Sequence, residues 1–226
     1  MYPDKMKNRD LPDFMAATLD CDPANTRTFA RFLRDAGVLP SDQDAPAKLE
    51  YAVDLMLALL GASCPAEAAA ASRNFGSLPA QSVTPIRAAR DGSAQFLTPI
   101  PIAHVRLTSV AKETQRLLRR SLRDFLVVTI SDTRLSDDDP PGADALRLIS
   151  GANAPMAVAS IGLHGTDDDG HVLFAVGPSP VKRLRARMEV VVPNAALRPL
   201  IVEWSMWSPH RASPQPQTVE DESCRR

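Results

Sequence analysis

The sequence lacks most of the features that identify secreted, membrane and disulfide-bonded proteins. Its three cysteines, Cys21, Cys64 and Cys224, lie far apart and fit no CxxC spacing, which argues against a disulfide framework or a structural zinc site. The N-terminus has no apolar core of signal-peptide length. The longest apolar stretch, residues 52–62, contains Asp54 and is too short to span a bilayer. These absences predict a soluble cytoplasmic protein without membrane contacts.

Motifs for catalysis are missing as well. The sequence contains no GxSxG, no P-loop, no GxGxxG and no HExxH, so it offers no recognisable nucleophile, phosphate-binding loop or zinc-binding histidine pair. Two runs of aspartate, at 137–139 and 167–169, have no EF-hand spacing, and consecutive side chains diverge too far to share one ion. We therefore expect solvated turns at both runs, no metal, no cofactor and no enzymatic activity.

Net charge and aromatic content are also low. The net charge is −1 and aromatic residues make up 5% of the chain, so aliphatic residues must fill the core and any nucleic-acid surface must be a local patch. Proline, in contrast, is frequent, with 20 residues that concentrate in two segments. This composition predicts a linker over residues 78–101 and a disordered tail over residues 208–226.

Hydrophobic periodicity predicts a helical domain over residues 8–77. Asp10 and Pro12 mark the start of a short helix that ends near Leu19. Gly37 and Gly61 supply stop signals for two later helices. The helices after the first are predicted over residues 24–36, 47–60 and about 64–76.

The second half, residues 102–207, has mixed periodicity. One amphipathic segment, residues 109–123, has a leucine-rich face and a basic face, as expected of a helix laid on a sheet. β-Branched or alternating patterns predict strands, listed here with their ranges: 102–107, 125–131, 156–163, 171–176 and 187–192. A short apolar stretch lies at 145–149, and a turn or short helix is expected over 193–204. The predicted fold class is α+β: an N-terminal helical domain of helix-turn-helix type, followed by a small antiparallel sheet domain with one basic helix.

The stretch from residue 14 to residue 39 has the pattern of a helix-turn-helix motif. Such a motif needs a small residue where the two helices cross, which Ala16 or Ala17 supplies, and a tight turn, which residues 20–23 supply. Asp20 stands where glycine is favoured, and Thr26 stands where an aliphatic anchor is expected. Apolar residues are expected to fix the second helix to the core, namely Phe29, Phe32 and Leu33.

The opposite face of the helix over 24–36 is expected to point outward. It carries residue types that bond base edges or phosphates: Asn25, Arg27, Thr28, Arg31 and Arg34. Residues 23–36 have a local net charge of +2. The pattern is typical of a DNA-reading helix, although an ordinary helical hairpin with solvated arginines would give the same pattern.

The run RFLRDAGVLP, followed by a polar loop and the leucine-rich AVDLMLALLGA, resembles the opening of helix-turn-helix proteins encoded among bacterial prophage and gene-transfer-agent genes. The matching residues are Arg31, Leu33, Arg34, Ala36, Gly37, Leu39 and Pro40. The resemblance spans about residues 10–76, and it implies a phage-type transcriptional regulator.

Two further segments concentrate positive charge. The predicted basic helix contributes four candidate phosphate contacts, Arg116, Arg119, Arg120 and Arg123, and the VKRLRAR segment contributes three more, Lys182, Arg183 and Arg185. Both could add salt-dependent affinity for a nucleic acid. The alternatives are the solvated face of a helix for the first segment and a charged sheet edge that limits aggregation for the second.

These patterns lead to one functional hypothesis and two alternatives. The hypothesis is a transcriptional regulator of phage or gene-transfer-agent type that binds double-stranded DNA as a homodimer, with the second half for dimerisation or for contact with a protein such as RNA polymerase. The first alternative is a non-enzymatic adaptor that docks on a partner through its basic helix. The second is a DNA-packaging recognition subunit that assembles into rings.

Overall fold

The computed structural model describes residues 6–88, 94–96, 98–104, 118–132, 144–151, 155–162, 169–175 and 186–205. Helices occupy the N-terminal part, and within the described residues an antiparallel sheet and further helices follow, as the α+β prediction requires. The predicted tail over 208–226 lies outside the described residues. Within the described residues, no helix has the length and apolar character needed to cross a membrane.

The four predicted N-terminal helices are confirmed to within a few residues. They are α1 (Leu11–Thr18), α2 (Pro23–Asp35), α3 (Leu49–Gly61) and α4 (Ala68–Gly76), the last preceded by the short 3-10 helix η1 (Pro65–Glu67). Asp22 caps α2 because its Oδ2 accepts a hydrogen bond from the Asn25 N–H at 2.7 Å. Gly37, two residues after α2, has a φ of 68°, the left-handed conformation predicted for this stop signal.

The described strands form a seven-stranded antiparallel sheet. The strands are β1 (Ala80–Ala88), β2 (Ala94–Phe96), β3 (Ile100–Pro101), β4 (Asp144–Gly151), β5 (Pro155–Gly162), β6 (Asp169–Ala175) and β7 (Ala186–Pro193). Their order is β2-β1-β6-β5-β4-β7, and β3 pairs with β1. The predicted strands at 156–163, 171–176 and 187–192 are confirmed as β5, β6 and β7, and the first two pair with each other.

The prediction of a linker over 78–101 is wrong. This segment contains β1, β2 and β3, and β1 lies inside the sheet, paired with β6 and with β2. Val83 of β1 is 4% exposed and stands opposite Val172. Prolines at 79 and 85 conceal the strand in the sequence, because proline cannot donate to a ladder and reads as a linker residue.

The strand predicted over 125–131 is also wrong, because these residues belong to helix α6 (Leu122–Asp132). Leu122, Phe125, Leu126 and Ile130 are buried, and their spacing of three and four residues places them on one helical face. The β-branched residues of this run favour a strand by local preference, but burial of a helical stripe against the sheet outweighs that preference.

The segment before α6 differs from its prediction too. The strand expected over 102–107 begins as the 3-10 helix η2 (Ile102–His104), and residues 105–117, which include most of the predicted basic helix, lie outside the described part of the chain. That helix does not run on to residue 123, because a turn at Arg119 and Arg120 and a bridge between Ser121 and Pro79 precede α6.

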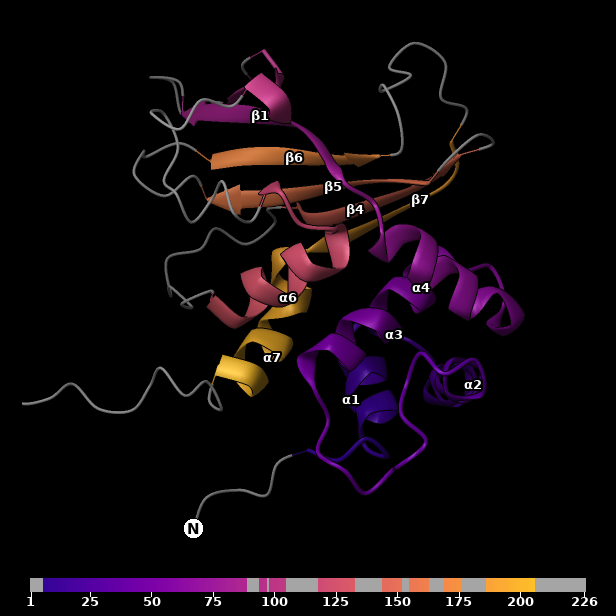
Figure 1. Cartoon of the computed structure of the whole chain (residues 1–226). Coiled ribbons are helices and arrows are strands. Elements are labelled where there is room, and N and C mark those ends of the chain that lie inside the picture. Colours follow the sequence, from indigo (N-terminus) through magenta and orange to yellow (C-terminus); the bar gives the residue numbers. More distant parts are fainter. Residues whose placement is uncertain are drawn as a thin grey trace, which may run out of the picture.

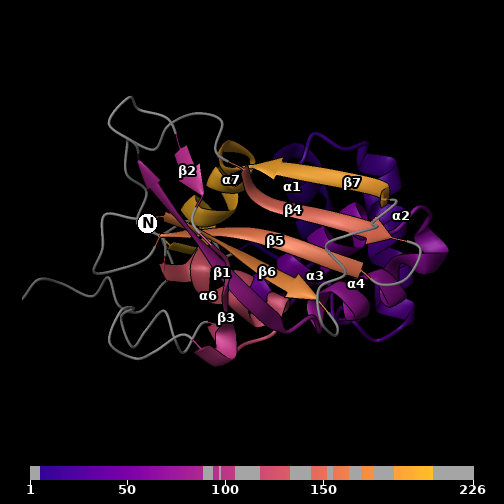
Figure 2. The ribbon, with the colours of Figure 1, turned by 90° about the horizontal axis from the view of Figure 1, so that it is seen from above.

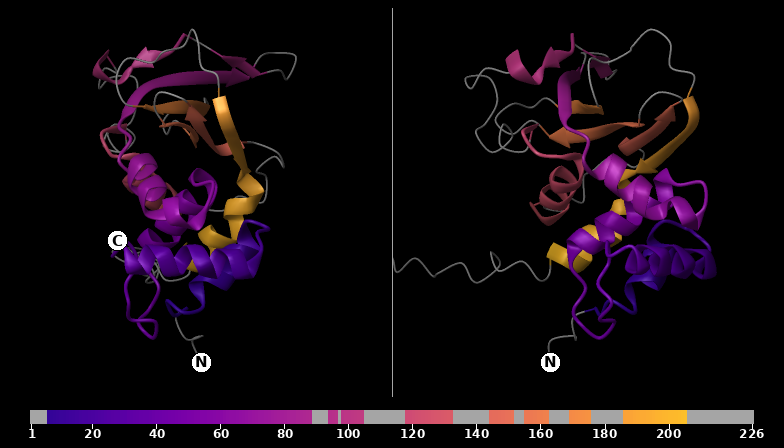
Figure 3. Two further views of the ribbon diagram at one scale, coloured as in Figure 1. Left: turned by 90° about the vertical axis from the view of Figure 1, so that its right-hand side faces the viewer. Right: turned by 45° about the vertical axis from the view of Figure 1, so that its right-hand side comes forward.

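The labelled α-helices lie on one face of the sheet (Figure 1). The view from above in Figure 2 shows the strands in front and the helices behind them, and Figure 3 shows the sheet curving around the helical side. The last helix, α7 (Asn194–Ser205), follows β7 and packs beside α6. The ring of Phe125 on α6 packs edge-on against that of Phe174 on β6, with ring centres 5.1 Å apart. Buried residues of the N-terminal helices, the sheet, α6 and α7 form one hydrophobic cluster.

Candidate functional site

The first two helices are joined by a four-residue turn. Asp20, at the position where glycine is favoured, adopts the left-handed conformation with a φ of 51°, which aspartate tolerates better than most residues. The Cys21 N–H donates to the Ala16 carbonyl at 2.9 Å and so closes the end of α1. Asp20 therefore adopts the left-handed conformation for which glycine is otherwise favoured.

One face of α2 is fixed to the core. Thr26, Phe29, Ala30 and Leu33 are buried, at the spacing of a helical stripe. Thr26 occupies the predicted aliphatic position without leaving a polar group unsatisfied, because its hydroxyl donates to the Asp22 carbonyl at 3.0 Å.

Phe32 does not anchor α2, and this part of the prediction is wrong. Its side chain is 36% exposed, and the Arg31 guanidinium lies 5.6 Å from the centre of its ring. At about 100° per residue, position 32 lies roughly 110° from the centre of the buried stripe, so Phe29 and Leu33 face the core and Phe32 does not.

The five residues predicted to point outward are all at least partly accessible. Asn25, Arg27 and Arg31 are exposed, and Thr28 and Arg34 are partly exposed. The Thr28 hydroxyl donates to the Ala24 carbonyl at 2.9 Å. Arg34 donates from Nη2 to the Asn8 carbonyl at 3.2 Å, so its guanidinium is turned toward the N-terminal segment rather than outward.

Arg27 is paired with an acid from the first helix. Its Nε and Nη2 donate to Oδ1 and Oδ2 of Asp13 at 2.7 and 2.9 Å. The hydrogen bonds from Arg27 lower the pKa of Asp13, which therefore stays ionised at neutral pH. Asp13 and the capping Asp22 offset the net charge of +2 that the sequence assigns to residues 23–36.

Three of the other predicted phosphate contacts, Arg119, Arg120 and Arg123, lie within the described residues. Arg123 belongs to α6 and forms a two-pronged ion pair with Asp54 of α3, so the prediction that it lies on an open basic face is wrong. Arg119 and Arg120 are exposed in the turn before α6. Arg116, Lys182, Arg183 and Arg185 lie outside the described residues.

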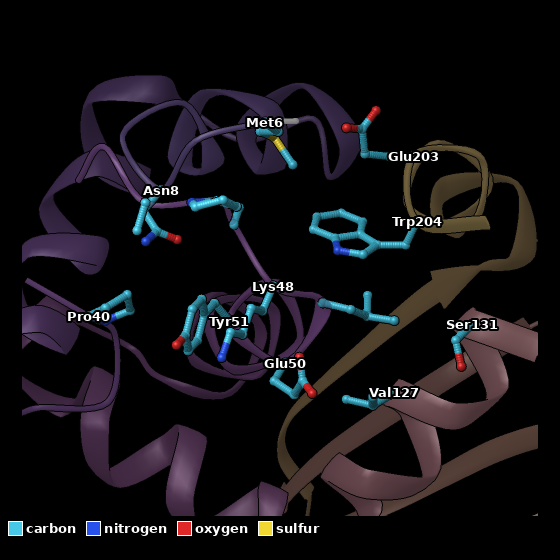
Figure 4. Close-up of a pocket in the computed structure, with 14 residues that line it drawn as sticks. Met6, Asn8, Pro40, Lys48, Glu50, Tyr51, Val127, Ser131, Glu203 and Trp204 are labelled. Carbon is cyan, nitrogen blue, oxygen red and sulfur yellow. The ribbon is translucent and has the colours of Figure 1, made fainter. Parts of the chain in front are cut away.

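The structure contains a pocket of about 710 Å³ that no sequence pattern predicted. Its walls come from the N-terminal segment, the loop that precedes α3, the first turn of α3, and one face each of α6 and α7. Figure 4 shows the Trp204 ring reaching from α7 toward the N-terminal segment, with Tyr51 of α3 on the opposite side. No local motif could reveal this pocket, because its walls are distant in sequence.

Comparisons with family models, with curated proteins and with solved structures gave no match for this chain. Among the described residues, no group of three or more histidine, cysteine, aspartate or glutamate side chains is placed to hold a metal ion.

Proposed function

We propose that the chain is a DNA-binding transcriptional regulator of phage or gene-transfer-agent type that reads the major groove with α2. One observation carries the proposal: a four-residue turn joins two helices, and the second is anchored by one face and open on the other. A helix held in this way can enter a groove without exposing core residues.

Arg31 and Asn25 are the residues best placed for base or phosphate contact. Both are exposed, and within the described residues neither side chain makes an ion pair or a hydrogen bond. Arginine bonds guanine edges or phosphates through two donors, and asparagine bonds adenine in the same way. Arg31 also has its guanidinium over the Phe32 ring, which restricts its freedom before binding.

Arg27 needs a change of partner before it can contact DNA. Its two donors toward Asp13 have the geometry that a phosphate would use, so a phosphate can replace the carboxylate. The displaced Asp13 would then lie near the DNA backbone and repel it. Under this proposal Asp13 moderates affinity, and the strength of binding depends on this pair.

A protein-interaction adaptor is the second candidate, and Phe32 favours it. An exposed aromatic ring stacked with an arginine is a combination enriched at the centres of protein interfaces. The pairing of Arg27 with Asp13 also removes much of the positive charge that DNA would attract. This candidate differs from the adaptor expected from the sequence, which docks through its basic helix, because here the outward face of α2 contacts another protein.

Fluorescence anisotropy with two DNA duplexes distinguishes the candidates. One duplex carries the region upstream of the chain's own coding sequence, and the other has a scrambled sequence. The proposal requires tighter binding to the first, a steep loss of affinity as salt rises, and a loss of about 1–3 kcal/mol on Arg31→Ala.

Two control variants accompany Arg31→Ala. Arg198→Ala removes the same charge from an exposed position on α7 and should leave affinity within about twofold. Phe32→Ala tests the adaptor, because it should abolish capture of a protein partner and should lower DNA affinity much less than Arg31→Ala does, through loss of the ring that orders Arg31. Affinity that is independent of salt, or that Arg31→Ala does not change, would refute DNA reading by α2.

A further inference from the structure

The pocket has the size and construction of a small-molecule site. Its volume of about 710 Å³ lies within the range of roughly 300–1,000 Å³ in which drug-sized ligands are enclosed. Segments near residues 6, 46, 127 and 204 converge on it, so several separate parts of the chain hold its walls.

The walls favour a flat apolar ligand. Tyr51 and Trp204 are partly exposed aromatic residues, and Met6, Leu49 and Val127 add apolar surface between them. The Trp204 ring is fixed from behind by Phe14 of α1, which meets it edge-on with ring centres 5.9 Å apart. A ring held in this way can stack on a ligand with little loss of side-chain freedom.

The charged groups of the pocket favour a positively charged ligand. Glu50 and Glu203 are both partly buried, and within the described residues neither carboxylate has a hydrogen-bond or ion-pair partner. Lys48 is the cationic residue in the described lining, and its ammonium lies 5.8 Å from the centre of the Tyr51 ring. The ring thus already faces a cation. The two carboxylates outnumber the one lysine of the lining, while Arg123, outside the lining, interacts electrostatically with Glu50.

Asn8 adds a hydrogen-bond acceptor to the same wall. Its Nδ2 donates to the Asp42 carbonyl at 2.8 Å, which sets the orientation of the amide. Its Oδ1 is buried and has no hydrogen-bond partner within the described residues. A donor on a bound ligand, reached by a small movement of this side chain, would satisfy an acceptor that is otherwise costly to bury.

We propose that this pocket binds a flat aromatic ligand that carries a protonated amine or amidine. The ring lies between Tyr51 and Trp204, and the cation is held by Glu50 and Glu203. The inference is independent of the DNA-binding proposal, since it concerns a different part of the surface. The competing chemistry is an anion, which Lys48 and the start of α3 would attract.

Isothermal titration calorimetry of the full chain with three naphthalene compounds separates these possibilities. The amine is 2-naphthylmethylamine, the neutral compound is 2-naphthylmethanol and the anion is 2-naphthylacetate, so mainly the charge differs. We expect the amine to bind about tenfold more tightly than the anion, with the alcohol between them. Tighter binding of the anion, or no binding of any compound, overturns the proposal.

Substitutions then assign the binding to this pocket. Glu203→Gln and Glu50→Gln should each lower the affinity for the amine by about fivefold and leave the affinity for the alcohol unchanged. Glu67→Gln, outside the pocket, should change neither affinity. Lys48→Met should raise the affinity for the amine, because it removes the ammonium that competes for the Tyr51 ring. Trp204→Phe keeps an aromatic contact with Phe14 and should weaken all three compounds. Amine binding that none of these variants alters would place the site elsewhere and refute the assignment.

Discussion

Arg123 and Asp54 connect two helices that lie far apart in the sequence. Nε of Arg123 donates to Oδ1 of Asp54 at 2.7 Å, and Nη2 donates to Oδ2 at 2.8 Å. Asp54 lies in the middle of the apolar helix α3 and is 5% exposed, whereas the Arg123 side chain is 33% exposed. The hydroxyl of Ser72, on α4, lies 3.4 Å from the same carboxylate. One charged residue therefore links α3, α4 and α6.

Loss of Arg123 should destabilise the fold. Arg123→Met leaves the Asp54 carboxylate buried without its counter-ion, which typically costs about 3–5 kcal/mol, and partial exposure of the arginine favours the lower end. Urea denaturation should show this loss, whereas Arg119→Met, at an exposed position nearby, should change stability by less than about 0.5 kcal/mol. The double variant Asp54→Leu/Arg123→Met should recover much of the loss. Equal stability of Arg123→Met and the wild type would contradict the role assigned to the pair.

Gly61 at the end of α3 should not tolerate alanine. A Cβ at this position would lie 2.6 and 2.7 Å from two ring carbons of Phe75, which is buried and cannot move freely. We expect Gly61→Ala to lower the free energy of unfolding by about 1–3 kcal/mol, although alanine favours a helix.

A matched glycine and a relieving variant test this steric reason. At Gly37 a Cβ would meet no atom within 4 Å. Gly37→Ala should therefore cost only the free energy of placing a side chain in the left-handed conformation, about 1 kcal/mol, and Gly37→Asn should cost less. Phe75→Leu in the Gly61→Ala background should restore part of the stability lost to the clash. If Gly61→Ala alone stabilises the fold, the Phe75 ring can move away from the new Cβ and the predicted steric clash is wrong.

The Asp13–Arg27 pair should respond to acid in a defined direction. Because hydrogen bonds from Arg27 lower the Asp13 pKa from its ordinary value of 3.8, the pair stabilises the folded state fully above that value and loses its contribution as the pH falls through the lowered pKa. The difference in unfolding free energy between the wild type and Asp13→Asn should therefore be constant from pH 7 to pH 5 and should shrink below pH 4. A difference that grows in acid would contradict the sign of this shift.

The same substitution tests the proposed function. Asp13→Asn removes a negative charge beside α2 and releases Arg27, so it should raise DNA affinity. The slope of log affinity against log salt concentration should become steeper by the amount expected for about one additional phosphate contact. Arg27→Ala should have the opposite effect on affinity. Asp22→Asn, which keeps a capping side chain, serves as a control for the loss of one negative charge. If Asp13→Asn weakens binding, Asp13 cannot be a competitor of the phosphate.

Cys21 and Cys64 should differ in their reactivity. Partial burial, and secondly the charge of Asp20, raise the pKa of the Cys21 thiol, so little thiolate forms at neutral pH, whereas Cys64 is exposed. Iodoacetamide at pH 7.5 should modify Cys64 first, as mass spectrometry of the peptides would show. Asp20→Asn should speed the reaction of Cys21, and unfolding in urea should remove the difference between the two cysteines. Equal rates in the folded protein would contradict the burial of Cys21.

Elements with local signals in the amino-acid sequence were predicted correctly. Asp10 and Pro12 predicted the start of α1, a broad apolar face predicted α3, and Gly37 marks the end of α2 where the structure has it. Alternating apolar residues predicted β5, β6 and β7. These predictions succeeded because caps, turns and hydrophobic stripes act within a few residues of one another.

The remaining features depend on contacts between segments that are distant in the sequence. Residues 125–131 are helical, which lets Phe125 pack on Phe174 of the sheet. The proline-containing segment after α4 forms β1, which pairs with β6. The pairing of Arg27 with Asp13 and the pocket around Trp204 likewise depend on residues far apart in the chain. Contacts of this kind leave no periodic signal in the sequence, because their energy appears only when distant segments meet.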